Sequence, residues 1–212
     1  MSVKIKFCGI TNPKDALWAS NLGVDYIGLN FVKSSPRKVS IKQAQKIISS
    51  IPEFVKSVFV FANENVKEIL KVVKKLKPDY IQLHGDEDLN YVKTLKSNGL
   101  NIIKVVRIGE ENEDFKIYEE YCDFVEFFLL DKKSELLGGT GEIFNWDKAI
   151  KFKEEINKPF FLAGGLNPEN VKEAVEKVKP FGVDVASGIE KTPRSKDYKK
   201  MQEFIRNVQK AK

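Results

Sequence analysis

Short apolar runs alternate along this chain with longer segments in which apolar residues recur every three or four positions. The runs Val55–Phe61 and Ile102–Ile108 are rich in Val, Ile and Phe and are typical of buried strands. By contrast, Asn65–Leu76 interleaves apolar residues with Lys and Glu at helical spacing, which predicts an amphipathic helix. The same alternation continues from one end of the chain to the other.

Eight strand–helix pairs are predicted in this way. The strands are Val3–Phe7, Asp25–Phe31, Val55–Phe61, Tyr80–Leu83, Ile102–Ile108, Phe124–Leu130, Phe160–Ala163 and Phe181–Ala186. The helices that follow them are Pro13–Leu22, Ile41–Ser50, Asn65–Leu76, Asp88–Ser97, Glu113–Tyr121, Trp146–Ile156, Pro168–Val178 and Lys196–Lys210. Strands joined through helices form parallel sheets, and eight such units are the signature of a closed (βα)8 (TIM) barrel.

We therefore expect an α/β fold with one (βα)8-barrel domain over residues 1–212. A doubly wound open sheet is the structural alternative, but no Gly-x-Gly-x-x-Gly follows the first predicted strand. The hydrophobic content of 42% suits one domain with a sizeable core.

Composition narrows the setting of the protein. No apolar run reaches the length of about 18 residues that a membrane span needs, and no signal-peptide pattern is present, so we expect no membrane partner. Two cysteines, Cys8 and Cys122, cannot build a disulfide framework, and a reducing, cytoplasmic setting is expected.

The net charge of +6 is compatible with nucleic acid, an anionic surface or an anionic small ligand. The lysines are interleaved with Glu and Asp and do not cluster with aromatic residues, so no nucleic-acid partner is expected. Of 36 basic residues only four are arginines, namely Arg37, Arg107, Arg194 and Arg206. An arginine in this chain is therefore a candidate for bidentate binding of a carboxylate or phosphate.

Cys8 ends the first predicted strand and is followed by Gly9, with Asn12 as the expected N-cap of the next helix. A thiolate at this corner could act as a nucleophile or a general base. The dipole of the following helix is expected to lower its pKa. The alternative is that Cys8 is a small buried apolar residue.

Other strand ends carry polar groups. Arg37 lies in a loop stiffened by Pro36 and is a candidate for anion binding, or a surface arginine. His84 follows the fourth strand and could be an acid/base group, a hydrogen-bond donor or a structural residue. Arg107 ends the fifth strand and could likewise be functional or structural.

Asp131 closes the apolar run Phe127–Leu130, where a carboxyl group can have a raised pKa and act as an acid. The alternative is an aspartate that caps a turn. The glycine-rich stretch 138–141 that follows is predicted to be a mobile lid.

Two glycine corners follow the last two strands. Gly164 and Gly165 come after the seventh strand, and Ser187 and Gly188 come after the eighth, just beyond Asp184. Free amide groups at these places cradle phosphate in many barrels, whereas tight turns are the alternative. One histidine and two distant cysteines do not make a metal site, and no P-loop or nicotinamide motif is present. The sequence thus predicts cofactor-free proton transfer on a phosphorylated small molecule.

Taken together in order, these motifs resemble the phosphoribosylanthranilate isomerase (TrpF) family of tryptophan biosynthesis across the whole chain. They are Lys6–Thr11, Ser35–Arg37, Gln82–Gly85, Leu130-Asp131, the stretch 138–141, Leu162–Val171 and Val183–Glu190. The family fold is a small (βα)8 barrel, and its reaction is an Amadori rearrangement. It converts N-(5-phosphoribosyl)anthranilate to 1-(2-carboxyphenylamino)-1-deoxyribulose 5-phosphate without a cofactor. The family includes monomers and homodimers.

The resemblance implies roles for the two catalytic candidates. Asp131 is expected to be the general acid that protonates the ribose ring oxygen, and Cys8 the general base that removes the proton from sugar carbon 2.

It also implies a set of substrate-binding residues. Arg37 matches the residue that binds the anthranilate carboxylate, and Asp184 matches an active-site aspartate. The remaining candidates for contacting the substrate and its phosphate are His84, Gly164, Gly165, Ser187 and Gly188.

The chain departs from the family pattern at three places. Ala163 and Ala186 stand where the family often has serine, which puts phosphate affinity in doubt more than chemistry, because backbone amides remain. Arg194 replaces part of a common Pro-Gly and either adds charge near the phosphate or lies on the surface.

Two other functions compete with this one. A related barrel isomerase acts on the histidine-pathway aminoaldose but is expected to use two aspartates, whereas the first strand here ends in Cys8. A phosphate- or nucleic-acid-binding module without catalysis would fit the basic charge, but it would not need both Cys8 and Asp131.

Overall fold

The computed structural model describes residues 2–109, 114–133 and 145–211. Its eight parallel strands close into a barrel in chain order, and the first strand pairs with the last. They are β1 (Lys4–Phe7), β2 (Tyr26–Asn30), β3 (Lys56–Phe61), β4 (Tyr80–Leu83), β5 (Ile102–Ile108), β6 (Phe127–Lys132), β7 (Phe160–Leu162) and β8 (Gly182–Val185). The predicted (βα)8 barrel is confirmed, and the open sheet is wrong.

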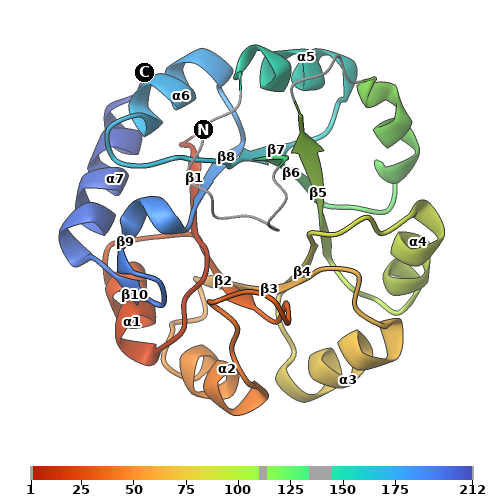
Figure 1. The fold of residues 1–212 in the computed structure, drawn as a ribbon, viewed down its shortest axis with the longest axis horizontal. Coiled ribbons are helices and arrows are strands. Elements are labelled where there is room, and N and C mark those ends of the chain that lie inside the picture. Colours follow the sequence, from red (N-terminus) through yellow and green to blue (C-terminus); the bar gives the residue numbers. More distant parts are fainter. Residues whose placement is uncertain (1, 110–113, 134–144, 212) are drawn as a thin grey trace.

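Helices surround this barrel on all sides (Figure 1). They are α1 (Pro13–Asn21), α2 (Ile41–Ile48), α3 (Val66–Leu76), α4 (Leu89–Ser97), the 3-10 helix η1 (Phe115–Tyr121), α5 (Asp147–Glu155), α6 (Val171–Val178) and α7 (Tyr198–Lys210). Most of these helices begin with a side-chain cap, whereas α5 and α6 have none. The side chain of Asn12 accepts a hydrogen bond from the Asp15 amide, as predicted, and Ser40 forms a reciprocal capping box with Gln43.

The helix predicted after β5 differs from expectation, since η1 is a 3-10 helix and begins at Phe115. Phe115, Tyr118 and Tyr121 recur at a spacing of three, and residues at this spacing eclipse one another in a 3-10 helix. The stacked face packs its rings against the barrel and α5, with Tyr118 on Phe128 and Phe115 on Phe152. Aromatic packing therefore selects the tighter helix.

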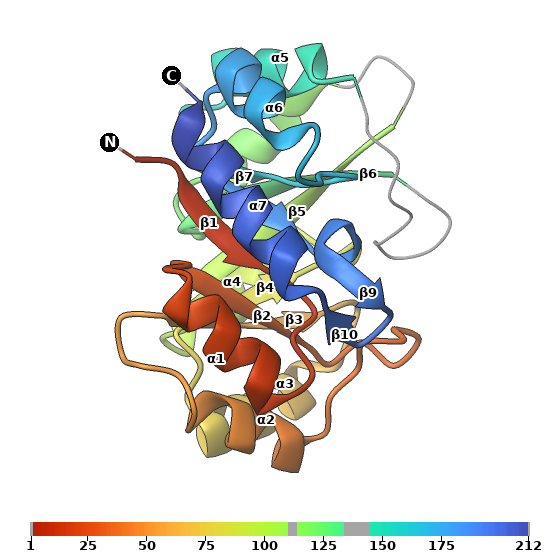
Figure 2. The same ribbon diagram turned by 90° about the vertical axis from the view of Figure 1, so that its left-hand side faces the viewer.

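The segment after β8 also differs from expectation. It forms a short 3-10 helix, η2 (Ser187–Ile189), and an antiparallel hairpin of β9 (Glu190–Thr192) and β10 (Ser195–Lys196). The helix predicted to begin at Lys196 begins at Tyr198, because Asp197 caps the amides of Lys199 and Lys200. The hairpin lies at the end of the barrel opposite the two termini (Figure 2).

The barrel interior is aromatic at one end and polar at the other. Tyr26, Tyr80, Phe127 and Phe161 pack edge-to-face or tilted near the amino ends of the strands. Side chains two residues further along a strand point to the same side. The inward face of β4 thus continues from Tyr80 to Gln82. Polar groups therefore occupy the end of the barrel where the loops open.

No helix among the described residues is long and apolar enough to cross a membrane.

Candidate active site

The carboxyl ends of the strands bring Cys8 beside a buried lysine. A Cβ atom added at Gly28 would lie 2.7 Å from the Cys8 sulfur and 3.2 Å from Lys6 Nζ. Both groups therefore converge on the same glycine of β2. Glycine at position 28 provides the space that allows the thiol and the ammonium group to meet.

Lys6 is fully buried and forms an ion pair with Asp184, with 2.8 Å between Nζ and Oδ1. The two residues are paired in register on β1 and β8. Burial opposes the charged lysine, but attraction to Asp184 and Cys8 outweighs it, and the pKa of Lys6 is raised. Asp184 therefore lies at the predicted site, where its carboxylate is paired with the buried Lys6.

The expected lowering of the Cys8 pKa is wrong. Burial raises the pKa of the Cys8 thiol, although the positive charges of Lys6 and Lys196 act in the opposite direction. Helix α1 begins only at Pro13, with Asn12 as its cap, so its first turn lies several residues beyond the thiol. The loss of water around the sulfur therefore outweighs the nearby positive charges, and it favours the neutral thiol form of Cys8.

Asp131 is held on two sides at the end of β6. Its Oδ1 accepts a hydrogen bond of 2.9 Å from the Lys132 amide, and its Oδ2 lies 3.2 Å from His84 Nε2. The other ring nitrogen of His84 lies 3.0 Å from Gln82 Nε2. Asp131, His84 and Gln82 form one chain of contacts from β6 to β4.

Arg37 is joined to the hairpin by a bidentate ion pair. Its Nε and Nη2 donate to Glu190 at 2.8 and 2.7 Å. The side chain crosses Gly9, where an added Cβ would lie 2.5 Å from Arg37 Cδ, so only glycine admits it. Beneath this pair, the buried Lys196 Nζ donates to Glu190 at 3.1 Å and to the Cys8 carbonyl at 2.6 Å.

This three-charge cluster carries a net positive charge close to Cys8. The hydrogen bond to Glu190 raises the pKa of Arg37. Burial opposes ionisation of Glu190, but Arg37 and Lys196 overcome it and its pKa is lowered. Burial lowers the pKa of Lys196. The cluster would attract an anionic group to the mouth of the barrel beside β1.

Arg194 supports the loop that presents Arg37. Its Nη1 donates to the carbonyls of Pro36 and Lys38, both at 2.9 Å, and its own carbonyl accepts from Thr11. Its φ of +75° places it in the left-handed region, at the turn of the β9–β10 hairpin. The structure therefore gives Arg194 a supporting contact within the protein.

The two glycine corners lie against each other. An added Cβ at Gly188 would lie 2.1 Å from the Leu166 carbonyl, which explains the glycine there. Gly164 and Gly165 both have positive φ, and their amides donate to no acceptor within the described residues. Ser187 precedes Gly188 in η2, directly beside this turn. The structure brings together the four residues predicted to form a phosphate cradle.

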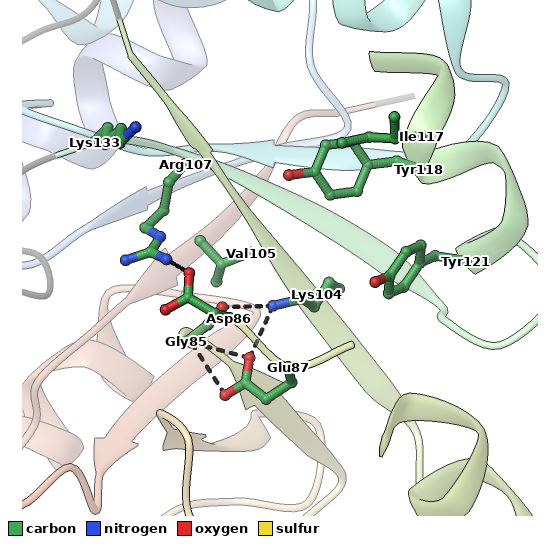
Figure 3. Close-up of a pocket in the computed structure, with 10 residues that line it drawn as sticks. All are labelled: Gly85, Asp86, Glu87, Lys104, Val105, Arg107, Ile117, Tyr118, Tyr121 and Lys133. Atoms are coloured by element: carbon green, nitrogen blue, oxygen red, sulfur yellow. Dashed lines mark hydrogen bonds and ion pairs between the residues drawn. The ribbon is translucent and has the colours of Figure 1, made fainter. Parts of the chain in front are cut away.

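Arg107 forms an ion pair with Asp86, which joins the ends of β5 and β4 (Figure 3). In the same view, Lys104 donates to the Gly85 carbonyl at 2.7 Å and to Glu87 at 2.8 Å. These residues line a cavity of about 380 Å³ next to η1. Arg107 therefore connects the ends of β5 and β4 through its ion pair with Asp86.

Four residues of the site were missed from the sequence: Lys6, Gln82, Glu190 and Lys196. Lys6 and Gln82 could have been recognised from the sequence as polar residues inside predicted strands. Barrel strands are covered on both faces, so a polar residue in mid-strand is expected to point into the barrel. Glu190 and Lys196 gave no such signal, since they resemble surface charges until the hairpin folds back. The predicted lid at residues 138–141 lies outside the described residues.

The described residues contain no group of three or more His, Cys, Asp or Glu side chains placed to hold a metal ion. They do offer a thiol beside an ammonium group, a carboxyl group fixed by two donors, and a glycine cradle. In strand order the cradle on β7 and β8 lies between Asp131 on β6 and Cys8 on β1. This order suits proton transfer at two points of one anionic ligand.

Comparison with known proteins agrees with this geometry. The chain matches the family N-(5'phosphoribosyl)anthranilate (PRA) isomerase over residues 5–207. A protein of Aquifex aeolicus named N-(5'-phosphoribosyl)anthranilate isomerase is 46% identical, covering 97% of this chain and 98% of that protein. A crystal structure of phosphoribosyl anthranilate isomerase with reduced 1-(o-carboxyphenylamino)-1-deoxyribulose 5-phosphate has a TM-score of 0.85 at 36% identity and covers 98% of both chains. Mutually generated monomers of the dimeric Thermotoga maritima isomerase give a TM-score of 0.84 at 36% identity, again over 98% of both chains.

Proposed function

Because this chain belongs to the N-(5'-phosphoribosyl)anthranilate isomerase family, we propose that it rearranges N-(5-phosphoribosyl)anthranilate with Asp131 as general acid and Cys8 as general base. It is an isomerase of tryptophan biosynthesis. The product of the proposed reaction is 1-(2-carboxyphenylamino)-1-deoxyribulose 5-phosphate. The observation that carries the proposal is the placement of the two groups on either side of the glycine cradle in strand order.

The proposed acid step opens the sugar ring. Asp131 gives its proton to the ribose ring oxygen, the bond from that oxygen to carbon 1 breaks, and the anilino nitrogen lone pair forms a C=N iminium bond. The two contacts to the Asp131 oxygens hold its carboxyl plane during this transfer. General acid catalysis of this kind contributes about 10²- to 10⁴-fold.

The proposed base step follows at carbon 2. The Cys8 thiolate removes the carbon 2 proton, the bonding electrons form the C1=C2 double bond, and the C=N electrons return to nitrogen. The resulting enolamine gains a proton at carbon 1 and loses its hydroxyl proton to become the ketone. Lys6 lies beside the sulfur and would stabilise the thiolate before the proton is taken.

The remaining contacts would place the substrate. The amides of Gly164, Gly165 and Gly188 and the residue Ser187 would hold the phosphate, near Asp184. Arg37 would bind the anthranilate carboxylate. Glu190 uses Nε and Nη2 of the guanidinium, which leaves the Nη1 side to face a ligand.

Turnover of freshly made phosphoribosylanthranilate, followed by anthranilate fluorescence, tests the proposed function. We expect activity on this substrate and none on the histidine-pathway aminoaldose. The opposite preference would assign the chain to the other isomerase. We further propose a cytoplasmic location and a monomeric or homodimeric state.

Replacing Arg37 with lysine is expected to raise KM about ten- to a hundredfold, because one ammonium group cannot hold Glu190 and also reproduce a contact to the carboxylate worth about 1.5–3 kcal/mol. The kcat value should change less, since the carboxylate lies away from the reacting atoms. Steady-state kinetics measures both constants. Arg206→Lys on the exposed face of α7 is the matched control. An unchanged KM in Arg37→Lys would remove Arg37 from the binding site.

The raised pKa of Cys8 predicts the alkaline side of the pH profile. Only the thiolate accepts the carbon 2 proton, and burial keeps the thiol protonated to higher pH than usual. The thiolate of Cys8 and the protonated carboxyl group of Asp131 are needed together, so the profile has two limbs, and we expect one of them to lie above the ordinary pH range of a thiol. In Cys8→Asp the base is a carboxylate, so this limb should move to lower pH. A limb that stays in place would belong to another group.

A further inference from the structure

Gln82 is a buried polar side chain without a predicted function. It is 1% exposed on the inward face of β4, two residues before His84. Its Nε2 contacts His84 Nδ1 at 3.0 Å, while its Oε1 is buried without a hydrogen-bond partner in the described structure. A buried carbonyl oxygen left unpaired costs stability. The amide is therefore placed for its contact with the histidine ring.

The main chain around His84 is fixed independently of the ring. The His84 amide donates to the Phe61 carbonyl at 2.8 Å. The next peptide is clamped on both sides, since the Gly85 amide donates to Glu87 and its carbonyl accepts from Lys104 (Figure 3). With the backbone held, the variable that remains at this site is the position of the proton on the imidazole.

The contacts on the two ring nitrogens select one tautomer. Gln82 Nε2 is a donor, so Nδ1 must be the bare acceptor, and the proton of a neutral ring lies on Nε2. That proton points to Asp131 Oδ2 at 3.2 Å. With the amide reversed, Oε1 would face Nδ1, which would then have to carry the proton of a neutral ring. Nε2 would be bare and would accept the proton that Asp131 must give to the ring oxygen.

The charged side chains that β5 and β8 place near this site are engaged elsewhere. Arg107 on β5 pairs with Asp86, and Lys104 pairs with Glu87. Asp184 on β8 pairs with Lys6. Among the described residues, Gln82 is the side chain that contacts Nδ1.

We propose that Gln82 sets the Nε2–H tautomer of His84, and that His84 thereby orients the Asp131 carboxyl group for the acid step. Both are positioning residues, and the proposal rests on the proposed role of Asp131. With His84 on Oδ2 and the Lys132 amide on Oδ1, the carboxyl group cannot rotate. Its proton is then delivered from one fixed direction, which is what a general acid requires.

Because His84 is the only histidine in the chain, the tautomer can be read directly. Protein labelled with 15N-histidine gives one pair of ring nitrogen signals, and bare and protonated nitrogens resonate in separate ranges. We expect a bare Nδ1 and a protonated Nε2 in the free enzyme at assay pH. In Gln82→Glu, a carboxylate replaces the donor, and Nδ1 should become protonated. A protonated Nδ1 in the unaltered enzyme would overturn the proposal.

Kinetics connects the tautomer to the reaction. We expect Gln82→Glu to lower kcat about ten- to a hundredfold, the value of one hydrogen bond to a charged group, with KM nearly unchanged. The exposed Gln45→Glu on α2 is the matched control for added charge. Gln82→Leu, which presents no donor or acceptor, replaces Gln82→Glu if that variant fails to fold. A changed His84 spectrum with unchanged kcat would overturn the proposal.

A pair of His84 variants separates orientation from packing. Glutamine can reach Asp131 with an amide donor near the position of Nε2, whereas alanine cannot. We expect His84→Gln to keep more of kcat than His84→Ala, and equal loss would contradict a positioning role. If Asp131→Asn remained fully active, the proposed acid would be wrong, yet the His84 tautomer measured in the free enzyme would stand.

Discussion

Alanine at position 8 is expected to lower kcat by about 10²- to 10⁴-fold, the usual contribution of a general base. The thiol is placed at the end of β1 against Gly28 and beside Lys6, and alanine keeps the backbone but has no group that can accept a proton. The proposed substrate contacts of Arg37 and of the glycine corners are left intact, so KM should change little. Steady-state turnover of phosphoribosylanthranilate measures kcat and KM. The melting temperature, measured alongside, shows whether the variant is folded.

Cys122→Ala is the control for losing a cysteine. Cys122 also has a pKa raised by burial, but it follows η1 and its thiol contacts the Tyr118 carbonyl. Its removal should leave kcat unchanged. Cys8→Ser should resemble Cys8→Ala, because a hydroxyl group is a far weaker base precursor than a thiol at neutral pH. Normal turnover in a folded Cys8→Ala enzyme would reject the base assignment.

Asparagine at position 131 is the second substitution with a large expected effect. The amide is nearly isosteric with the carboxyl group and can still accept a hydrogen bond from His84, so the architecture of β6 should persist. It cannot release a proton to the ribose ring oxygen, and the leaving alkoxide would depart unassisted. We expect kcat to fall by about 10²- to 10⁴-fold with little change in KM.

The matched control is Asp86→Asn, which removes a carboxylate at a neighbouring strand end. Asp86 pairs with Arg107 and has a side chain that is 71% exposed, so its loss should have a small effect on turnover and stability. If Asp131→Asn is as active as the unaltered enzyme, another group protonates the ring oxygen.

Positions along the strands could be predicted because they follow from local pattern. Cys8 follows a short strand that alternates apolar residues with lysines, Asp131 follows an apolar run, and the ends of parallel strands in a barrel meet at one face. The pairings between them could not be predicted in the same way. His84 contacts Asp131 only because β4 and β6 stand on the same side of a closed barrel, and Gln82 becomes part of the site through that contact.

The acidity of Cys8 shows where local reasoning gave the wrong sign. A thiol just before a helix is a reasonable candidate for a lowered pKa, since the helix dipole acts over its first turn. Burial raises it instead, and burial depends on residues from β2, β8 and β10 that are distant in sequence. Desolvation is a property of the packed molecule, so the sequence around Cys8 does not contain it.

By itself, the sequence determined the barrel, because eight alternations of buried strand and amphipathic helix leave few other ways to cover both faces of a parallel sheet. It also placed the candidate reactive groups at particular strand ends. Only the tertiary structure decided how the charges are shared: Lys6 with Asp184, and Arg37 with Glu190 above Lys196. The attraction between opposite charges depends on their distance and on burial, which also removes their water, and both are set only once β8 and the hairpin after it close against β1.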